Sequence, residues 1–233
     1  MLGEEKAMEL AARVASDFLE KTLAAPLSEF GLLVKDEVKF WRWKNQVKLV
    51  VRADEILKKR GVSRDEISGT VLPDHVIPLL EYGKDVSAPS LSEMFSNLLA
   101  NTMDPTTKEF HHPKFAQLLS EMTTREAEIL SFSLWFEDKI PSSHTMKNPI
   151  KFEDGSIGKR IWEGAFDDVD WNSASESPYY ISFENLQHAG LLFKGELYLS
   201  HFGRAFATSC GVEIQDDDFF GFQGKIDIMF RPE

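Results

Sequence analysis

The chain has 233 residues, of which 42% are hydrophobic and 12% aromatic, so it can bury a sizeable core as one large domain or two small ones. Its formal net charge of -12 repels phosphate backbones and argues against broad nucleic-acid binding. Charge or proline interrupts every hydrophobic run, which excludes a helix of the roughly 20 apolar residues that a membrane span needs.

The cysteine content and the N-terminal sequence indicate the compartment. The single cysteine, Cys210, cannot form an internal disulfide. The N-terminus lacks the basic segment, apolar run and small-residue cleavage site of a secretory signal. We therefore expect a cytoplasmic protein.

Two helices are predicted in the first 60 residues. The first, between Glu4 and Ala25, has apolar residues at helical spacing, namely Ala7, Ala11, Val14 and Phe18. Pro26 ends this helix. Ser28 is the expected N-cap of a longer helix, which should stop at Gly61 after three basic residues.

The second helix carries different side chains on two faces. One face is apolar and contains Phe40, Trp43, Val47 and Val50. On another face Lys44, Lys48 and Arg52 follow each other at four-residue steps, and we call these three residues the basic stripe. Between Lys35 and Arg60 there are nine basic residues and four acidic ones, so this segment is basic within an acidic chain. We predict that the basic stripe contacts an acidic partner or another part of this chain. The alternative is a solvated helix face.

Three shorter helices are predicted between residues 72 and 122. The segment "LPDHVIPLLEYG" indicates a helix with a break or kink at Pro78. Ser90 or Ser92 is expected to open the second of these helices, and Pro113 the third. Residues 1–122 are therefore predicted to form an N-terminal helical region.

The order of elements after residue 122 is typical of a winged helix. Thr123 or Thr124 should cap a helix, because "TTREAEIL" places Glu126 or Glu128 near the capping-box position. Beyond an irregular insertion at about 139–177, the sequence predicts a helix that Gly190 closes, a hairpin and a last helix in "HFGRAFATSC".

The predicted fold class is mainly α, with an N-terminal helical region and a winged-helix-like C-terminal part that contains a small β-hairpin. The winged-helix-like part covers residues 123–210, and its hairpin covers Leu191 to Ser200. Residues 211–233 form an acidic tail, in which "KIDIMF" can add an edge strand.

Two clusters have some of the residues of a metal site. His111 and His112 lie next to Glu109, but neighbouring side chains on a loop point apart and no spaced third ligand follows. The second cluster begins like an EF-hand loop, with Asp168, Asp170 and Asn172. Ser173 and Tyr179 then occupy the positions that need glycine and glutamate. We therefore predict no bound metal and no cofactor.

No catalytic constellation is evident. Cys210 has no sequence cue for an activating base, and phosphate-loop, nucleophile-elbow and dinucleotide motifs are absent from the sequence. Asp216, Asp217 and Asp218, followed by Lys225, resemble a nuclease site only loosely. Glu37 and Lys39 diverge if they lie on a helix, so they cannot share one metal-bound phosphate. The sequence therefore favours a protein that is not an enzyme.

The predicted helix in "SFENLQHAG" has few features of a DNA-reading helix. The residues available to face outward are Ser182, Glu184, Asn185, Gln187 and His188, and none of them is lysine or arginine. In the hairpin, Glu196 offsets Lys194. We therefore expect a structural or protein-binding winged helix.

Several stretches of the chain resemble the abortive infection alpha family of bacterial proteins. They are residues 26–57, "VIPLLEYG" with "LSEMFSNLLANTMDP", "HPKFAQLLSEMTTREAEIL" and the late "NLQHAGLLFKGELYLSHFGRAFATSC". The most recognisable positions of the family pattern are Gly31, Asp36, Arg42 and Asn45. The resemblance implies a role in phage exclusion, and it brings no established reaction, cofactor or catalytic residue.

The resulting hypothesis is a non-enzymatic component of a phage-defence response that acts through protein–protein binding or self-association. A winged-helix DNA-binding regulator is the first alternative. A metal-dependent nuclease is the second.

The first testable prediction concerns metal. Because each candidate ligand set lacks a geometrically essential member, we expect chelation with EDTA to leave the melting temperature unchanged. Thermal denaturation before and after chelation checks this. A fall of several degrees that one stoichiometric metal ion restores would show that the prediction is wrong.

Overall fold

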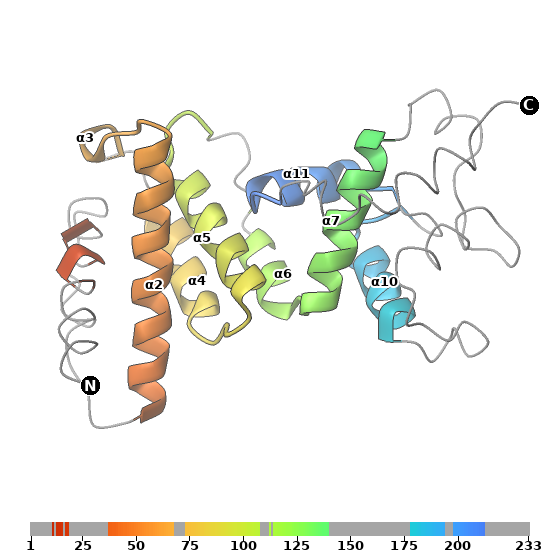
Figure 1. Cartoon of the computed structure of the whole chain (residues 1–233), viewed down its shortest axis with the longest axis horizontal. Coiled ribbons are helices and arrows are strands. Elements are labelled where there is room, and N and C mark those ends of the chain that lie inside the picture. Colours follow the sequence, from red (N-terminus) through yellow and green to blue (C-terminus); the bar gives the residue numbers. More distant parts are fainter. Residues whose placement is uncertain are drawn as a thin grey trace, which may run out of the picture. The chain divides into compact units, whose positions relative to one another are not determined.

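The structure, a computed structural model, describes residues 11, 13–15, 17–18, 37–67, 73–107, 112, 114–139, 178–193 and 198–212. These residues are mainly helical (Figure 1), which confirms the predicted fold class at that level. The chain divides into two compact units. Unit 1 comprises residues 1–122 with 209–211, and unit 2 comprises residues 123–208 with 212–233. Within the described ranges, none of the helices is long and apolar enough to cross a membrane.

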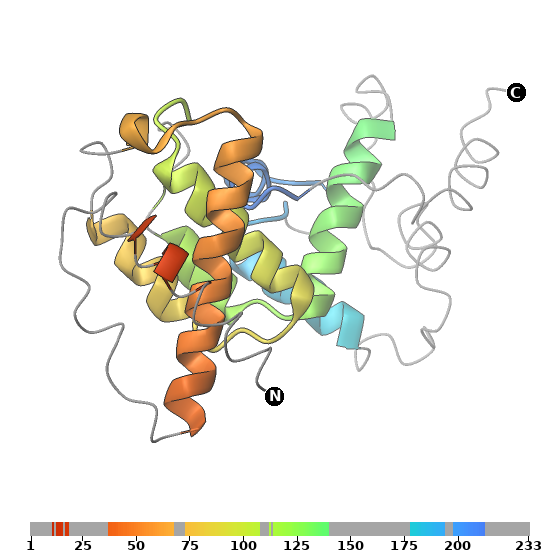
Figure 2. The same ribbon diagram turned by 60° about the vertical axis from the view of Figure 1, so that its left-hand side comes forward.

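In the described part of unit 1, residues 11, 13–15 and 17–18 are helical, within the first predicted helix, and five further helices follow. Helix α2 (Glu37–Lys59) packs against α4 (Pro73–Gly83) and α5 (Pro89–Met103), and α2 and α5 lie side by side in Figures 1 and 2. Helix α6 (Lys114–Glu121) packs against α4 and α5. The short helix α3 (Arg64–Ile67) follows α2.

The apolar core of unit 1 lies where these helices meet. Along α2 the buried residues recur every three or four positions, as Val47, Val50, Ala53 and Leu57. Helix α5 contributes Leu91, Phe95, Leu98 and Leu99. Val47 and Val50 confirm the predicted apolar face of α2. Phe40, at the start of that face, is 37% exposed and stacks on Trp43 with a centroid distance of 5.6 Å.

Local chemistry ends α2 where the sequence predicts. Gly61 adopts a left-handed φ of 77°. The amide of Val62 donates to the Leu57 carbonyl, and the amide of Gly61 donates to the Lys58 carbonyl, both at 3.0 Å. This is the Schellman pattern, which satisfies carbonyls that the last turn leaves free. The predicted stop at Gly61 is confirmed, whereas the predicted N-cap Ser28 lies outside the described residues.

The predicted break at Pro78 does not occur, and the start of α5 differs from the sequence-based prediction. Pro78 lies inside α4 and does not end it. Buried neighbours such as Val76, Leu79 and Leu80 offset the hydrogen bond that the proline lacks. Helix α5 begins at Pro89, so the predicted start at Ser90 or Ser92 is late. Proline fits the first turn, because amides at that position have no partner within the helix.

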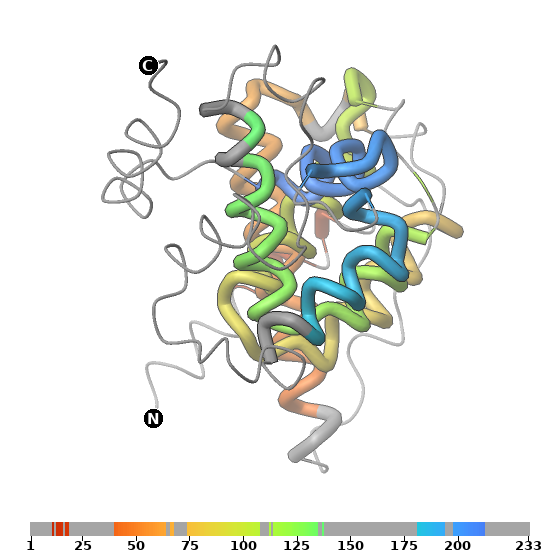
Figure 3. The backbone as a smooth tube through the Cα atoms, turned by 90° about the vertical axis from the view of Figure 1, so that its right-hand side faces the viewer, coloured from red at the N-terminus to blue at the C-terminus, as the bar shows by residue number. Residues whose placement is uncertain are grey.

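Unit 2 contains α7 (Thr124–Lys139), α10 (Pro178–His188) and most of α11 (His201–Ser209). Helices α7 and α10 pack against each other (Figure 3). The capping box before α7 uses Thr123 and Glu126: the Thr123 amide donates to Glu126 Oε2 at 2.6 Å, and the Glu126 amide donates to Thr123 Oγ1 at 3.3 Å. The structure thus selects one pair from the four predicted candidates.

Among the described residues of the predicted hairpin, the pairing consists of one antiparallel bridge, between Leu192 and Leu199. Two hydrogen bonds flank it, from the Phe193 amide to the Tyr198 carbonyl and from the Ser200 amide to the Leu191 carbonyl, both at 2.9 Å. A single pair does not make a ladder, and the described residues contain no strand. The winged-helix-like assignment with its small hairpin is therefore not supported.

Other sequence-based predictions fall outside the described residues. They are the irregular insertion beyond Lys139, the turn of the hairpin at residues 194–197 and the acidic tail after Val212.

Glu137 and Gly203 position the first part of α11 within unit 2. Glu137 accepts a hydrogen bond from the Leu199 amide at 2.6 Å and pairs with Arg204. Burial raises the pKa of Glu137, and these two partners offset part of that effect. Gly203 lies so close to Leu191 that an added Cβ would be 1.9 Å from the Leu191 carbonyl oxygen.

The second prediction uses this contact. Gly203→Ala should reduce the free energy of unfolding by roughly 1–3 kcal/mol, because a backbone carbonyl cannot rotate away as a side chain can. Urea denaturation followed by circular dichroism measures the change. Thr208→Ala, at an exposed position of the same helix, is the control and should stay within about 0.5 kcal/mol of the parent. Equal stability of the Gly203→Ala variant and the parent would contradict this packing.

Candidate functional site

The candidate site is a groove in unit 1 that is lined by α2, the start of α5, the connection before α5 and the N-terminal residue Ala11. Its volume is about 490 Å³. Helix α2 contributes Asn45, Lys48, Arg52 and other residues, and the connection between α4 and α5 contributes Val86 and Ser87. Two of the three residues of the basic stripe therefore line one concave surface. We call it the α2–α5 groove.

Arg52 is engaged within the chain. Its guanidinium donates to Glu93 on α5 at 3.1 Å and to Glu55 on α2 at 3.3 Å. These hydrogen bonds raise the pKa of Arg52 above its ordinary value, and the bond to Glu93 has the largest effect. The Arg52–Glu93 pair joins the two walls of the groove across 41 positions of sequence. Arg52 thus meets an acidic group of its own chain, which was one of the two predicted outcomes for the basic stripe.

Lys44 and Lys48 differ from Arg52. Lys44 is half-buried and Lys48 is exposed. Among the residues that the structure describes, neither ammonium group has an ion-pair partner. They lie four positions apart on the same helix, so their like charges oppose each other. In the described part of the chain, α2 therefore carries two cations without an ion-pair partner, Lys48 in the groove lining and Lys44 one turn before it.

Two family-pattern residues fix the connection that closes the groove at one end. The Asn45 side-chain amide donates to the carbonyls of Lys84 and Val86, at 3.0 and 3.2 Å. Arg42 Nε donates to Asp85 Oδ1 at 2.6 Å. Since these bonds hold three consecutive residues against α2, the position of Val86 in the groove depends on them. Gly31 and Asp36, the other two family-pattern residues, lie outside the described residues.

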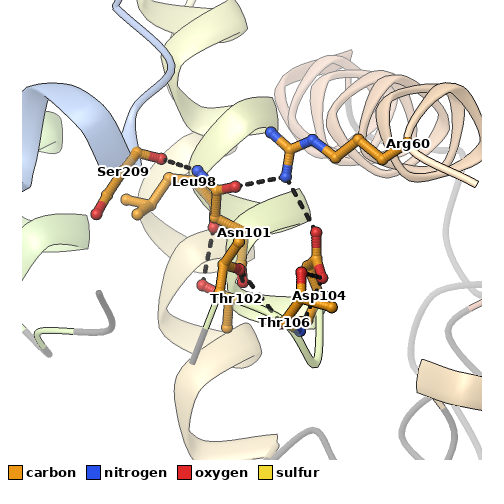
Figure 4. A network of polar contacts seen from close by, with 8 residues as sticks. Arg60, Leu98, Asn101, Thr102, Asp104, Thr106 and Ser209 are labelled. Atoms are coloured by element: carbon orange, nitrogen blue, oxygen red, sulfur yellow. Dashed lines mark hydrogen bonds and ion pairs between the residues drawn. The ribbon is translucent and has the colours of Figure 1, made fainter. Parts of the chain in front are cut away.

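A second polar cluster of unit 1 lies at the C-terminal ends of α2 and α5 (Figure 4). The Arg60 guanidinium donates to Asn101 Oδ1 at 2.6 Å and to Asp104 Oδ2 at 3.4 Å. The Asn101 amide donates to the Ser209 carbonyl at 2.6 Å, and both residues are buried. Each buried polar group in this cluster has a partner, which is the arrangement of a structural network.

Asp104 is the acidic member of this cluster and is 3% exposed. Burial opposes its ionisation. Hydrogen bonds from the Thr106 hydroxyl at 2.6 Å and the Thr106 amide at 2.9 Å, together with Arg60, outweigh that effect. The pKa of Asp104 is therefore lower than usual, and the folded state favours its charged form.

Comparison with known proteins identifies the family. The family model for abortive infection alpha matches residues 44–194. The chain belongs to the abortive infection alpha family. The matched region begins at Lys44 and includes Asn45, Lys48 and Arg52, whereas Arg42 precedes it. None of the curated proteins and none of the solved structures matches the chain.

Within this abortive infection alpha chain, the structure brings together histidines that the sequence separates. His75 and His112 line a small cavity of about 70 Å³ with Asp74 and Phe115. No group of three or more histidine, cysteine or acidic residues in the described ranges could hold a metal ion. His111 and Glu109, the other members of the first candidate metal cluster, lie outside those ranges, as do Asp168, Asp170 and Asn172.

Cys210, which the sequence did not indicate as a nucleophile, is buried, and burial raises the pKa of its thiol. The three aspartates at 216–218 and Lys225 fall outside the described part of the chain. Of the five α10 residues considered for DNA reading, Ser182 is buried, and the exposed Asn185 donates to Glu126 at 3.0 Å. Glu184 and His188 are exposed.

The sequence did not identify the carboxylate side of the groove. Glu55 lies three positions after Arg52, so its pairing was a local signal that could have been used. Glu93 carries no such signal, because only the packing of α5 on α2 brings it close to Arg52.

The third prediction concerns Asp104. Asp104→Asn should lower the free energy of unfolding at pH 7 by about 1–3 kcal/mol, since it removes a buried charged acceptor. Because the folded-state pKa lies below the ordinary value of about 3.9, this stability is present above that value and is lost as the pH falls through the folded-state pKa. The difference between parent and variant should therefore shrink between pH 7 and roughly pH 2.

Urea denaturation at both pH values measures this difference. Asp85→Asn is the control, because Asp85 forms an exposed pair with Arg42 whose loss should cost at most about 1 kcal/mol. A difference for Asp104→Asn that does not change with pH would contradict the pKa assignment.

Proposed function

We propose that this chain is a non-enzymatic component of a bacterial abortive-infection response, and that it binds another protein through Lys44 and Lys48 of α2. Membership of the abortive infection alpha family supports the biological setting. The observation that carries the binding proposal is that Lys44 and Lys48 have no ion-pair partner among the residues that the structure describes, and that Lys48 lines a groove, in a chain whose net charge is -12.

A protein partner fits this surface better than a nucleic acid does. Glu55 and Glu93 line the same groove as Lys48, and their carboxylates repel a phosphate backbone. A protein segment can avoid these carboxylates while it places a single acidic side chain on a lysine. Charged groups arranged in this way favour specific and fast association.

The properties of three ionisable side chains support a non-enzymatic role. Cys210 is buried with a raised pKa, so it is a poor nucleophile. Asp104, whose pKa is lowered, and Glu137, whose pKa is raised, are each held by partners that account for their positions. They therefore serve the fold.

The fourth prediction tests the function in cells. The double variant Lys44→Glu, Lys48→Glu should reduce protection against a phage that the parent chain restricts, because like charges then face the acidic partner. Plating efficiency of the phage measures protection, and immunoblotting compares protein levels. Lys114→Glu, an exposed charge reversal on α6, is the matched control and should protect like the parent.

Thermal denaturation shows whether the double variant remains folded. A folded, equally abundant double variant that protects as well as the parent would contradict binding through these lysines. A parent chain that restricts no phage would contradict the defence role itself.

A further inference from the structure

The α2–α5 groove combines a cationic edge with an apolar floor. Val51 and Val86 are half-buried and Pro89 is exposed, and all three line the groove. Lys48 also lines the groove. The volume of about 490 Å³ lies in the range of roughly 300–1,000 Å³ that is typical of pockets for small ligands or a few side chains.

The charged side chains are distributed unevenly along the groove. Arg52 is held by Glu55 and Glu93, so this end presents two carboxylates and one compensated cation. Toward the start of α2, Lys48 and Lys44 are uncompensated among the described residues. One end of the groove therefore attracts an anion, and the other end does not.

We infer that the α2–α5 groove receives a short acidic segment of another protein, with a carboxylate of that segment on Lys48 and an adjacent apolar side chain on Val51, Val86 and Pro89. This inference rests on the proposed function and names the chemistry of its partner. Arg52 is a positioning residue in this site, because it ties α2 to α5 and so keeps the two walls together.

Charge complementarity selects this occupant. An apolar segment without a carboxylate leaves Lys48 unpaired at a surface that it partly desolvates, which is unfavourable. A segment with several consecutive acidic residues meets Glu55 and Glu93 at the other end of the groove. The site therefore favours one acidic residue beside an apolar one over a long acidic run.

Site-specific photo-crosslinking in phage-infected cells tests this inference. A photoreactive amino acid replaces Ser87, an exposed residue on the groove lining, in the full-length chain. A second version carries it at Gln117, an exposed residue of α6 outside that lining. Mass spectrometry then identifies the crosslinked segment. Each version is combined with Lys48→Glu or, as the matched control, Lys114→Glu.

The expected result is a crosslink from position 87 to one protein segment with an acidic residue next to an apolar residue. Lys48→Glu should reduce its yield roughly tenfold or more, because it places like charges together, while Lys114→Glu should leave it unchanged. Thermal denaturation of the Lys48→Glu variant must show a folded chain. Arg52→Ala provides a second variant, which should reduce the yield by disturbing the groove walls while leaving Lys48 in place.

Several results would overturn the inference: a basic segment, a nucleic acid or a second copy of this chain crosslinked at position 87, or no crosslink there. A protein captured from position 117 alone would overturn the groove inference and leave protein binding standing. A chain that captures no protein from either position would count against the proposed function as well.

Discussion

The packing of α2 against α4 and α5 is the constraint on which unit 1 depends. Val47, Val50, Ala53 and Leu57 give α2 a continuous buried face. Gly83 allows α4 to come close, since a Cβ there would lie 2.4 Å from Leu49 Cδ1. Because this face is buried in the core, only the residues of α2 that lie outside it can contact solvent or a partner.

The polar residues of α2 divide into two groups according to that packing. Asn45 donates hydrogen bonds to the α4–α5 connection, and Arg52 donates one to α5. These bonds hold the walls of the groove in place. Lys44 and Lys48 make no such bonds in the described part of the chain. Of the three residues of the basic stripe, Arg52 thus pairs within the chain, and Lys44 and Lys48 are left for contacts with a partner. Our proposal of protein binding builds on these two lysines.

Features set by neighbouring residues could be predicted from the sequence, and features set by distant packing could not. The stops at Gly61 and Gly190 and the capping box of Thr123 with Glu126 arise within one helical turn. The Asn101–Ser209 hydrogen bond spans 108 positions, so no local pattern indicates it. The predicted hairpin is not supported as a pair of strands, because alternation and glycine positions indicate a turn between strands, whereas the described residues form one antiparallel bridge.

A double-mutant cycle on Arg52 and Glu93 tests the division of the basic stripe most directly. Unfolding free energies of Arg52→Ala, Glu93→Ala and the double variant should give a coupling of about 0.2–1 kcal/mol, as expected for an exposed pair. The same cycle with Lys48→Ala in place of Arg52→Ala should give no coupling. If Arg52 showed no coupling to Glu93, or if Lys48 showed the larger coupling, it would be wrong to assign Arg52 to pairing within the chain and the two lysines to contacts with a partner.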